Sequence, residues 1–346
     1  MLLFWNELLK ATLPCLAVSY LQKAANVSIT KVPVTGAGGF IGGYTVRHLE
    51  RVTGIPVIAG TRDGRAGSCR FDVQDVAGMT EALAGVSTVV HCAVGNRAVT
   101  VDGTRDLLQA AAKAGVRRVV HLSSMSVYGG ASGRVMEDTP MVSPDTGNYA
   151  GWKSAAEQTC LAEFGVETVR LRPTIVYGPG GKYWLGHTAR RIASGHWGLL
   201  GAAGDGACNL VHVSDVAGAI AAALSAPRAP GQAFNVNGPE TTTWNGYFQA
   251  LAKAMGRPPL RTITAMELQA RRYSALPLKA AAKLRPGLGR DWLLGVPSRS
   301  DLGLFASRAT YPVDAARDGL GWAPTMGTTA GLADSVEWLR SEGLAK

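Results

Sequence analysis

A glycine-rich turn between a short strand and a helix constrains this chain more than any other feature. Residues 31–43 read KVPVTGAGGFIGG and run into the helix-like segment YTVRHLERV. The spacing Gly36-x-x-Gly39-x-x-Gly42 permits a tight turn and lets backbone N–H groups approach a pyrophosphate, which then rests on the positive end of the helix. Because the glycines stand between a predicted strand and a predicted helix, they indicate dinucleotide binding. Pro33 fits this pattern poorly, since it removes a hydrogen-bond donor from the strand.

The rest of the N-terminal half alternates between apolar strands and helices. Buried strands are predicted at residues 56–60, 87–91, 117–123 and 166–173, and helices at 75–84, 101–115 and 148–164. This alternation predicts an α/β fold with a doubly wound parallel sheet of the Rossmann type and right-handed crossovers. Ligands bind at the carboxyl ends of such strands. Ser123 and Ser124 fall at one of these ends.

A tyrosine and a lysine open the helix predicted at 148–164. Tyr149 and Lys153 are four residues apart, so they share one helix face. Ionising a free tyrosine at pH 7 costs about 4 kcal/mol. A cation about 4–5 Å away returns roughly 3–4 kcal/mol at an effective dielectric constant of about 20, and an oxidised nicotinamide would add a second positive charge. The pair could therefore form an acid–base group, although an ordinary surface pair has the same spacing.

The end of the second strand bears on the choice of nicotinamide cofactor. An acidic residue there binds ribose hydroxyls, whereas an arginine accepts a 2′-phosphate. The strand ends in Gly60-Thr61-Arg62-Asp63, so Arg62 favours NADP over NAD, unless Arg62 pairs with Asp63 instead. Asp72 and Val73 follow the short third strand. Asp72 could meet the adenine or could cap the next helix.

Composition predicts a folded globular protein, and the cysteines predict a cytoplasmic one. The 346 residues are 47% hydrophobic and 17% charged, which is typical of a globular chain. The five cysteines have no C-x-x-C spacing, so they are interpreted as reduced thiols without a disulfide framework or a metal site. Residues 1–30 are too broken for a membrane span and make a poor signal peptide. They are interpreted as a packed or partly ordered N-terminal extension, or as the result of a start codon assigned too early.

The positive charge gathers in the C-terminal part. The formal net charge is +10, and residues 257–317 hold eleven Lys and Arg against four Asp and Glu. The excess indicates either a solvated basic face or attraction to an anionic substrate or surface. No nucleic-acid-binding motif accompanies it. Within this region, residues 266–285 mix apolar and basic positions, which fits either a helical lid over a substrate or a surface helix.

Taken together, these motifs resemble the extended short-chain dehydrogenase/reductase superfamily, in particular its NAD-dependent epimerase/dehydratase family. The resemblance covers roughly residues 31–240, in the expected order. It is carried by TGAGGFIGG, FDV (71–73), HCA (91–93), LSSMSVYG (122–129), YAGWK (149–153), LRPTIVYGPG (171–180) and NLVHVSDVA (209–217). It implies an interleaved architecture with a dinucleotide-binding domain at 31–179 and 208–237. A smaller substrate domain would comprise 180–207 and 238–346.

The resemblance also assigns roles to residues. It implies that Tyr149 is the acid–base group, that Lys153 binds the nicotinamide ribose and lowers the pKa of the phenol, and that Ser124 donates to the substrate oxygen. A carbonyl that receives hydride develops negative charge on oxygen, so two donors must converge there. The cofactor contacts it implies, beside Lys153, are Gly36, Gly39, Phe40, Ile41, Gly42, Arg62, Asp72, Val73, Ala93 and Pro173.

Two departures bear on the substrate. Thr100 stands where the family often has an asparagine that bridges the backbone, and Cys208-Asn209 stands where sugar-nucleotide enzymes usually have an arginine. His91, His121 and His212 are interpreted as core or strand-end residues whose hydrogen bonds are satisfied, and no metal site is expected.

Three functions therefore stay open. The first is an NAD(P)-dependent reductase or dehydrogenase acting on a secondary alcohol or ketone of a non-nucleotide small molecule. The second is a nucleotide-sugar epimerase or dehydratase, and the third is a non-catalytic NAD(P)-binding scaffold. The expected partner is a small-molecule substrate, without nucleic acid and without an integral membrane span. A homodimer is one candidate assembly.

Overall fold

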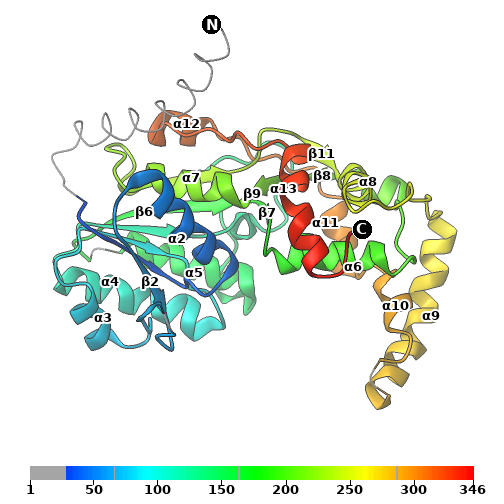
Figure 1. Cartoon of the computed structure of the whole chain (residues 1–346), viewed down its shortest axis with the longest axis horizontal. Helices are drawn as coiled ribbons and strands as arrows, with labels where there is room; N and C mark the ends of the chain where they lie inside the picture. Colours follow the sequence, from blue (N-terminus) through cyan, green and yellow to red (C-terminus); the bar gives the residue numbers. More distant parts are fainter. Residues whose placement is uncertain (1–28, 66, 163, 286) are drawn as a thin grey trace, which may run out of the picture.

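The computed structural model describes residues 29–346, except residues 66, 163 and 286. The chain forms two regions side by side (Figure 1). Nearly all of the N-terminal extension expected at 1–30 lies outside the described residues, as does Cys15. The other four cysteines are free thiols.

The first region is built on a parallel sheet of seven strands, in the order β10-β6-β5-β4-β1-β2-β3. The strands are β1 (Val32–Thr35), β2 (Val57–Thr61), β3 (Cys69–Arg70), β4 (Thr88–His91), β5 (Arg118–Leu122), β6 (Glu167–Pro173) and β10 (Ala233–Val236). The predicted doubly wound Rossmann fold is confirmed. Pro33 has the predicted local effect, because β1 pairs with β4 only at Val34 and Thr35.

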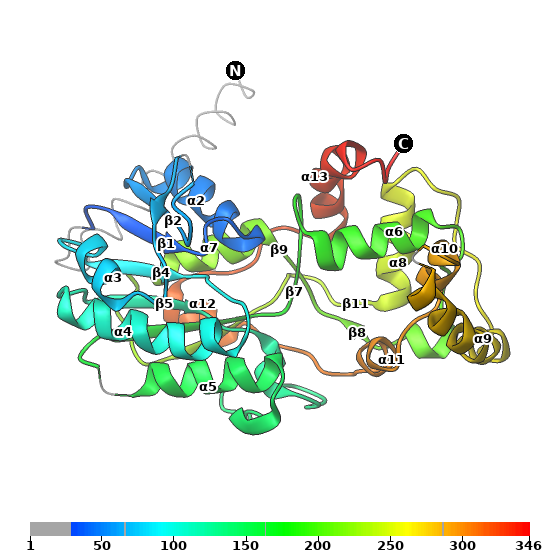
Figure 2. The ribbon, with the colours of Figure 1, turned by 90° about the horizontal axis from the view of Figure 1, so that it is seen from below.

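Helices cover both faces of the sheet (Figure 2). They are α2 (Phe40–Thr53), α3 (Val76–Ala82), α4 (Gly103–Lys113), α5 (Tyr149–Leu161) and α7 (Val213–Ala223). One core cluster joins α2 and α7 to one face, and another joins α3, α4 and α5 to the opposite face. Short helices η1 (Ala98–Asp102), η2 (Met125–Tyr128) and η3 (Pro144–Thr146) connect these elements. The structure thus places the predicted helices at 75–84, 101–115 and 148–164 to within a few residues.

The second region has two small sheets and a set of helices. Strand β7 (Ile175–Tyr177) pairs with β9 (Leu210–His212), and β8 (Ala207–Cys208) pairs with β11 (Thr242–Thr243). The helices are η4 (Lys182–His187), α6 (Thr188–Ala193), η5 (Gly201–Gly204), α8 (Trp244–Ala254), α9 (Ala265–Leu284), α10 (Arg290–Leu294), α11 (Arg299–Phe305) and α13 (Thr328–Ser341). An aromatic core holds them together, with the rings of Trp244 and Phe305 4.5 Å apart.

The chain returns to the first region near its C-terminus. Helix α12 (Asp314–Leu320) contacts β10 and α7. Ala316, Leu320 and Trp322 belong to the same core cluster as strands β1 and β6. The sheet's core therefore draws on residues far beyond 237. The domain boundaries expected from the sequence stay a prediction.

Candidate active site

The glycine turn connects β1 to α2 and lies against the end of β4. Gly36 has φ +68°, a left-handed conformation that favours glycine, and a Cβ built on it would lie 2.8 Å from the backbone of Ala93. The amide of Ala93 donates to the Thr35 hydroxyl over 3.3 Å. The two predicted cofactor segments, 36–42 and the segment after β4, therefore touch each other.

The start of α2 offers backbone donors for an anion. Gly39 is the N-cap and has no side chain to accept a hydrogen bond. The first helical bond runs from the Gly43 amide to the Gly39 carbonyl, at 2.9 Å. Among the described residues, no backbone carbonyl or side chain accepts from the amides of Phe40 and Ile41. Such donors at the positive end of a helix are what a pyrophosphate requires, so the chain's own groups fit a dinucleotide.

The end of β2 presents Arg62 on the surface. Asp63 does not pair with Arg62 but with Arg65, at 2.6 Å, which resolves the alternative left open by the sequence. No ion pair of Arg62 is found among the described residues. Asp72 accepts a hydrogen bond from the Gln74 amide, at 3.1 Å.

The residues around Asp72 decide between adenine contact and helix capping, the two roles that the sequence left open for it. The N-cap of α3 is Asp75, which accepts from the Gly78 amide, so Asp72 does not cap that helix. Val73 is buried and packs closely against Gly103. A Cβ built on Gly103 would lie only 2.6 Å from the Val73 side chain. Pro173 is also buried, at the end of β6 beside Val236 of β10.

Ser124 and Tyr149 meet at the carboxyl end of β5. Ser124 is the N-cap of η2, and Tyr149 is the first residue of α5, which Asn148 caps through the Gly151 amide. Loss of hydration raises the pKa of the Tyr149 phenol above its usual value, and the nearby Ser124 hydroxyl acts in the opposite direction. Tyr149 is still 44% exposed as a residue, so a ligand can reach it.

Lys153 lies deeper, one turn further along α5. It is 3% exposed, and its Nζ donates to the Leu122 carbonyl over 2.6 Å. Burial lowers its pKa to about 8, while Cys92, Cys160 and Glu157 act against that shift. The structure differs here from the electrostatic expectation. The pKa of the Tyr149 phenol is shifted by its burial and by Ser124, and Lys153 is not among the causes. The ammonium of Lys153 is directed instead at the Leu122 carbonyl of β5.

The charge of Lys153 also acts on Cys92, which follows β4 near the glycine turn. It lowers the pKa of the Cys92 thiol, although burial still raises that pKa to about 12. Cys92 precedes Ala93, which lies against the glycine turn. Lys153 thus lies between the ends of β4 and β5, on the side of the sheet where the glycine turn meets Ala93.

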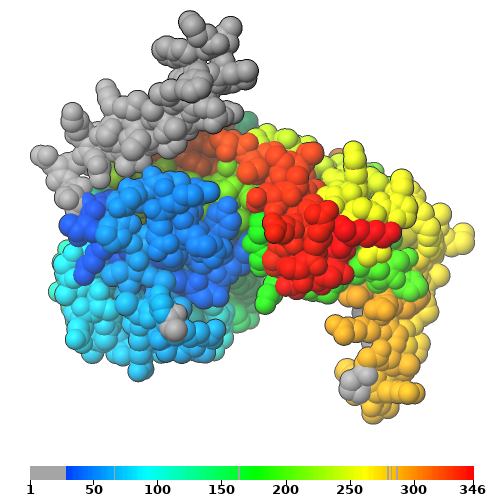
Figure 3. Space-filling view, in the orientation of Figure 1, coloured from blue at the N-terminus to red at the C-terminus, as the bar shows by residue number. Residues whose placement is uncertain are grey.

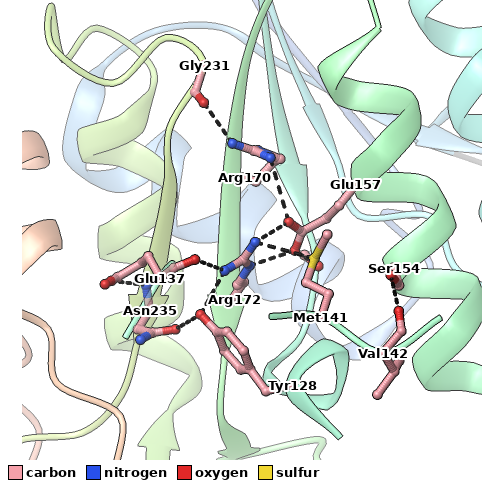
Figure 4. Close-up of polar contacts among 11 residues, drawn as sticks. Tyr128, Glu137, Met141, Val142, Ser154, Glu157, Arg170, Arg172, Gly231 and Asn235 are labelled. Carbon is pink, nitrogen blue, oxygen red and sulfur yellow. Dashed lines mark hydrogen bonds and ion pairs between the residues drawn. The ribbon is translucent and has the colours of Figure 1, made fainter. Parts of the chain in front are cut away.

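A buried ion network fixes α5 to β6 (Figure 4). Glu157 is fully buried and accepts from Arg172 through Nε at 2.8 Å and Nη2 at 2.6 Å. Arg170 lies 3.8 Å from the same carboxylate. The Ser123 hydroxyl donates to Glu157 over 2.5 Å. Glu157 therefore ties together the helix of Tyr149, the strand end beside Ser124 and β6.

Tyr128 extends this network. Its hydroxyl donates to Asn235 of β10 over 2.7 Å and accepts from Arg172 over 2.8 Å. The Arg172 guanidinium also lies 4.9 Å from the centre of the Tyr128 ring. Burial raises the pKa of Tyr128 to about 12, so this phenol stays protonated and acts as a structural link.

Sequence reasoning missed this network. Its signal was present: Arg170 and Arg172 stand two apart on one side of a strand that was expected to be buried. Buried guanidinium groups need acidic partners. Glu157, eight residues after Tyr149, is the acidic residue within α5.

The two residues that depart from the family pattern have local partners. The Thr100 hydroxyl bonds the backbone N–H and carbonyl of Gly95, both at 3.2 Å. Asn209 donates to the Ala309 carbonyl over 2.9 Å, and Cys208 is fully buried. The Asn209 amide therefore links strand ends to a C-terminal segment.

The three strand histidines are buried. His91 bonds Thr35 at 2.8 Å and Thr104 at 3.0 Å, and burial lowers its pKa to about 3. His212 bonds Ser214 at 2.7 Å. His121 differs from the expectation of a satisfied core residue, because neither of its ring nitrogens has a hydrogen-bond partner in the described part of the chain. Among the described residues, no group of three His, Cys, Asp or Glu side chains is arranged to hold a metal ion.

A parallel sheet with a glycine turn at its switch point, beside a serine, a tyrosine and a lysine, defines a dinucleotide-binding enzyme fold. The model of the NAD dependent epimerase/dehydratase family matches residues 32–237. The chain belongs to this family, within the extended short-chain dehydrogenase/reductase superfamily, so the resemblance drawn from the motifs is confirmed.

Relatives of known activity differ in what they act on. A 2-alkyl-3-oxoalkanoate reductase of Stenotrophomonas maltophilia (strain K279a) is 28% identical over 335 residues, covering 87% of this chain and 97% of that protein. Sterol demethylase protein B of Methylococcus capsulatus (strain ATCC 33009 / NCIMB 11132 / Bath) is 28% identical over 344 residues, covering 90% and 98%. The structure of MoeE5 in complex with UDP-glucuronic acid and NAD has a TM-score of 0.66 and 27% identity, covering 90% and 99%.

No helix among the described residues is both long enough and apolar enough to cross a membrane.

Proposed function

We propose that this protein is an NAD(P)-dependent oxidoreductase that transfers hydride at a secondary alcohol or ketone of a non-nucleotide small molecule. The observation that carries the proposal is the packing of α5 on η2, which brings Tyr149 near Ser124 at the end of β5, with Lys153 one turn further along α5. Two neighbouring hydroxyl donors near a dinucleotide turn suit a substrate oxygen. A scaffold that only binds NAD(P) would have no use for this arrangement.

The chain's own groups account for proton transfer and orientation. A phenol with a raised pKa is protonated near neutral pH, so Tyr149 can donate a proton to a carbonyl oxygen as negative charge develops there. Ser124 would donate a second hydrogen bond to the same oxygen. A nicotinamide, when bound, supplies or accepts the hydride. Lys153, held by the Leu122 carbonyl, would bind the ribose hydroxyls.

We also propose that the phosphorylated cofactor is preferred. Arg62 is exposed at the end of β2, and the nearby acidic residue Asp63 is held by Arg65. Arg62 is therefore available to a 2′-phosphate. Asp72 and Val73 would face the adenine, and Ala93 and Pro173 would contact the dinucleotide from the ends of β4 and β6. The two regions of the chain would then act as cofactor and substrate domains, in a cytoplasmic protein.

Two observations support a substrate class: the names of two relatives, and the residues Cys208 and Asn209. The two relatives matched along nearly their whole length are named for a 3-oxoalkanoate and for sterols. At the position where sugar-nucleotide enzymes usually have an arginine, Cys208 is buried and Asn209 is bonded to Ala309. Both points favour an apolar alcohol or ketone. The alternative, a nucleotide-sugar epimerase or dehydratase, is favoured by the likeness to MoeE5.

Absorbance at 340 nm separates the two functions. A reductase consumes NADH or NADPH in proportion to an added long-chain 3-oxo compound or 3-ketosteroid, whereas an epimerase converts a UDP-sugar with no net change. We expect net consumption with the apolar ketones, abolished by Tyr149→Phe. Conversion of a UDP-sugar without net consumption would replace the first function by the second. If neither occurs and Tyr149→Phe leaves dinucleotide binding unchanged, the scaffold becomes the better reading.

A further inference from the structure

Exposed apolar side chains gather on one part of the second region. Nine large apolar residues are exposed in the described chain, and five of them lie between residues 266 and 288. They are Met266 at 82%, Tyr273 at 66%, Leu276 at 64%, Leu284 at 91% and Leu288 at 39%. Isolated exposed leucines are normal on a protein surface, but a cluster marks an interaction site.

The cluster follows one face of helix α9. Met266, Tyr273, Pro277, Ala280 and Leu284 are exposed and stand at spacings of seven, four, three and four residues, which is one side of an α-helix. We call these five residues the apolar stripe; Leu276 lies beside it.

The opposite face of α9 is the one that packs on the protein. Leu268 is 7% exposed and Ala275 is 1% exposed. Arg271 donates to the carbonyls of His196 and Gly295. The apolar stripe is therefore not the face that attaches α9 to the protein.

Residues 265–294 without residue 286, which we call the α9–α10 arm, lie at the end of the molecule remote from the sheet. Figures 1 and 2 both place α9 there. Figure 3 shows the same segment projecting from the body. Of the two readings offered by the sequence, a surface helix fits this position and a lid over the candidate active site does not.

The arm is also basic. Residues 265–294 contain six Lys and Arg against two Asp and Glu. One of the two acids, Glu267, is already paired with Arg261 at 2.7 Å and with Arg271 at 2.8 Å. Lys283, Arg285 and Arg290 are exposed near the end of the stripe. Exposed apolar residues flanked by exposed cations are typical of a helix that lies in the interface of an anionic membrane.

We propose that the α9–α10 arm docks this protein on an anionic lipid surface. The apolar stripe enters the boundary between headgroups and acyl chains, and Lys283, Arg285 and Arg290 contact lipid phosphates. A second copy of the chain fits less well, because it would bring the same cations against one another. The proposal is independent of the proposed reaction, since no residue of the candidate active site takes part.

Sedimentation of the full chain with lipid vesicles tests the proposal. We expect binding to vesicles of phosphatidylcholine and phosphatidylglycerol in equal amounts, weaker binding to phosphatidylcholine alone, and release by added salt. Tyr273→Ser with Leu284→Ser, and separately Lys283→Gln with Arg285→Gln, should each weaken binding to anionic vesicles by about tenfold or more.

Matched controls remove the same chemistry elsewhere. Leu161→Ser removes an exposed leucine at the end of α5, and Arg51→Gln with Lys113→Gln removes two exposed cations from the first region. Both should bind vesicles as the unchanged protein does. Circular dichroism and thermal melting should show that all variants fold.

Three results would overturn the proposal. The first is no binding to anionic vesicles. The second is binding that the arm variants and the controls reduce equally, which would assign it to another surface. The third is a concentration-dependent dimer, seen by light scattering without lipid and abolished by Tyr273→Ser with Leu284→Ser, which would make a second copy the occupant of the stripe.

Discussion

Replacing Glu157 by glutamine tests whether the buried ion network holds the candidate catalytic helix in place. The substitution keeps the shape of the side chain but removes the charge that Arg172 contacts at 2.6 Å and Arg170 approaches at 3.8 Å. Both arginines are nearly inaccessible to water, with exposed fractions of 3% and 6%. They would be left as buried cations without a counter-charge.

The magnitude follows from this burial. Removing one partner of a buried ion pair typically costs about 3–5 kcal/mol. Because single domains are stable by about 5–15 kcal/mol, the loss would be a large share of the total. With a denaturant slope near 3 kcal/mol per molar urea, the unfolding midpoint should fall by roughly 1 M or more. Urea unfolding, followed by circular dichroism, measures it.

Asp314→Asn on α12 is the exposed control. The Asp314 side chain is 52% exposed, and its two partners, Arg134 and Arg317, are 64% and 59% exposed. Loss of this charge should cost only about 1 kcal/mol or less, because exposed ion pairs contribute little. A Glu157→Gln protein as stable as the control variant would refute the reasoning. Because Glu157 also bonds Ser123, we expect turnover to fall while KM changes little; a large rise in KM alone would contradict a positioning role.

Three further predictions follow from the same geometry. Arg62→Ala should weaken NADP binding by about tenfold or more and leave NAD binding unchanged, as measured by fluorescence titration; equal losses would contradict a contact with the 2′-phosphate. Gly36→Ala should destabilise more than Gly54→Ala in thermal melting and should weaken dinucleotide binding. Both glycines have φ near +65° (+68° and +64°), but only the Gly36 substitution meets the Ala93 backbone, at 2.8 Å; equal melting temperatures would contradict the clash. Lys153 has a pKa of about 8 in the folded protein against a usual 10.5, so the unfolded chain binds more protons between these values and stability rises with pH across them. Below pH 8 the buried ammonium is charged and its desolvation lowers the stability of the folded protein in full. The unfolding free energy of the protein minus that of Lys153→Met should therefore rise by about 3 kcal/mol from pH 8 to pH 10.5. A difference independent of pH would refute the shift.

Local patterns were enough to predict the layout of the sheet. The glycine turn and the spacing of apolar strands depend on residues close in sequence, so the doubly wound fold, the helix begun by Tyr149 and the site of Ser124 could be predicted. The position of Lys153 one turn after Tyr149 on α5 could also be predicted. The direction of its side chain could not, because the acceptor is the Leu122 carbonyl on a strand far away in the sequence.

The need of Arg170 and Arg172 for an acidic partner could be predicted, but the partner itself could not, for the same reason. Glu157 contacts Arg170 and Arg172 on β6. Arg172 in turn contacts Tyr128 of η2, which is bonded to Asn235 of β10. Which of several acidic residues pairs with two buried arginines is decided only when helix and strand pack. The bonds of Asn209 to Ala309 likewise join segments that have no shared motif.

The return of the chain to the first region sets an order for its synthesis. Strand β10 closes one edge of the sheet, and Ala316, Leu320 and Trp322 fill the core beside it. Ribosomes release a chain from its N-terminus, so most of the polypeptide must emerge before this edge and this core are covered. Until then, β6 presents an open strand edge, which other chains can pair with. A protein shortened at residue 313 would keep Ser124, Tyr149, Lys153 and β10, but would lack Ala316, Leu320 and Trp322, so its exposed core would still make it prone to aggregate.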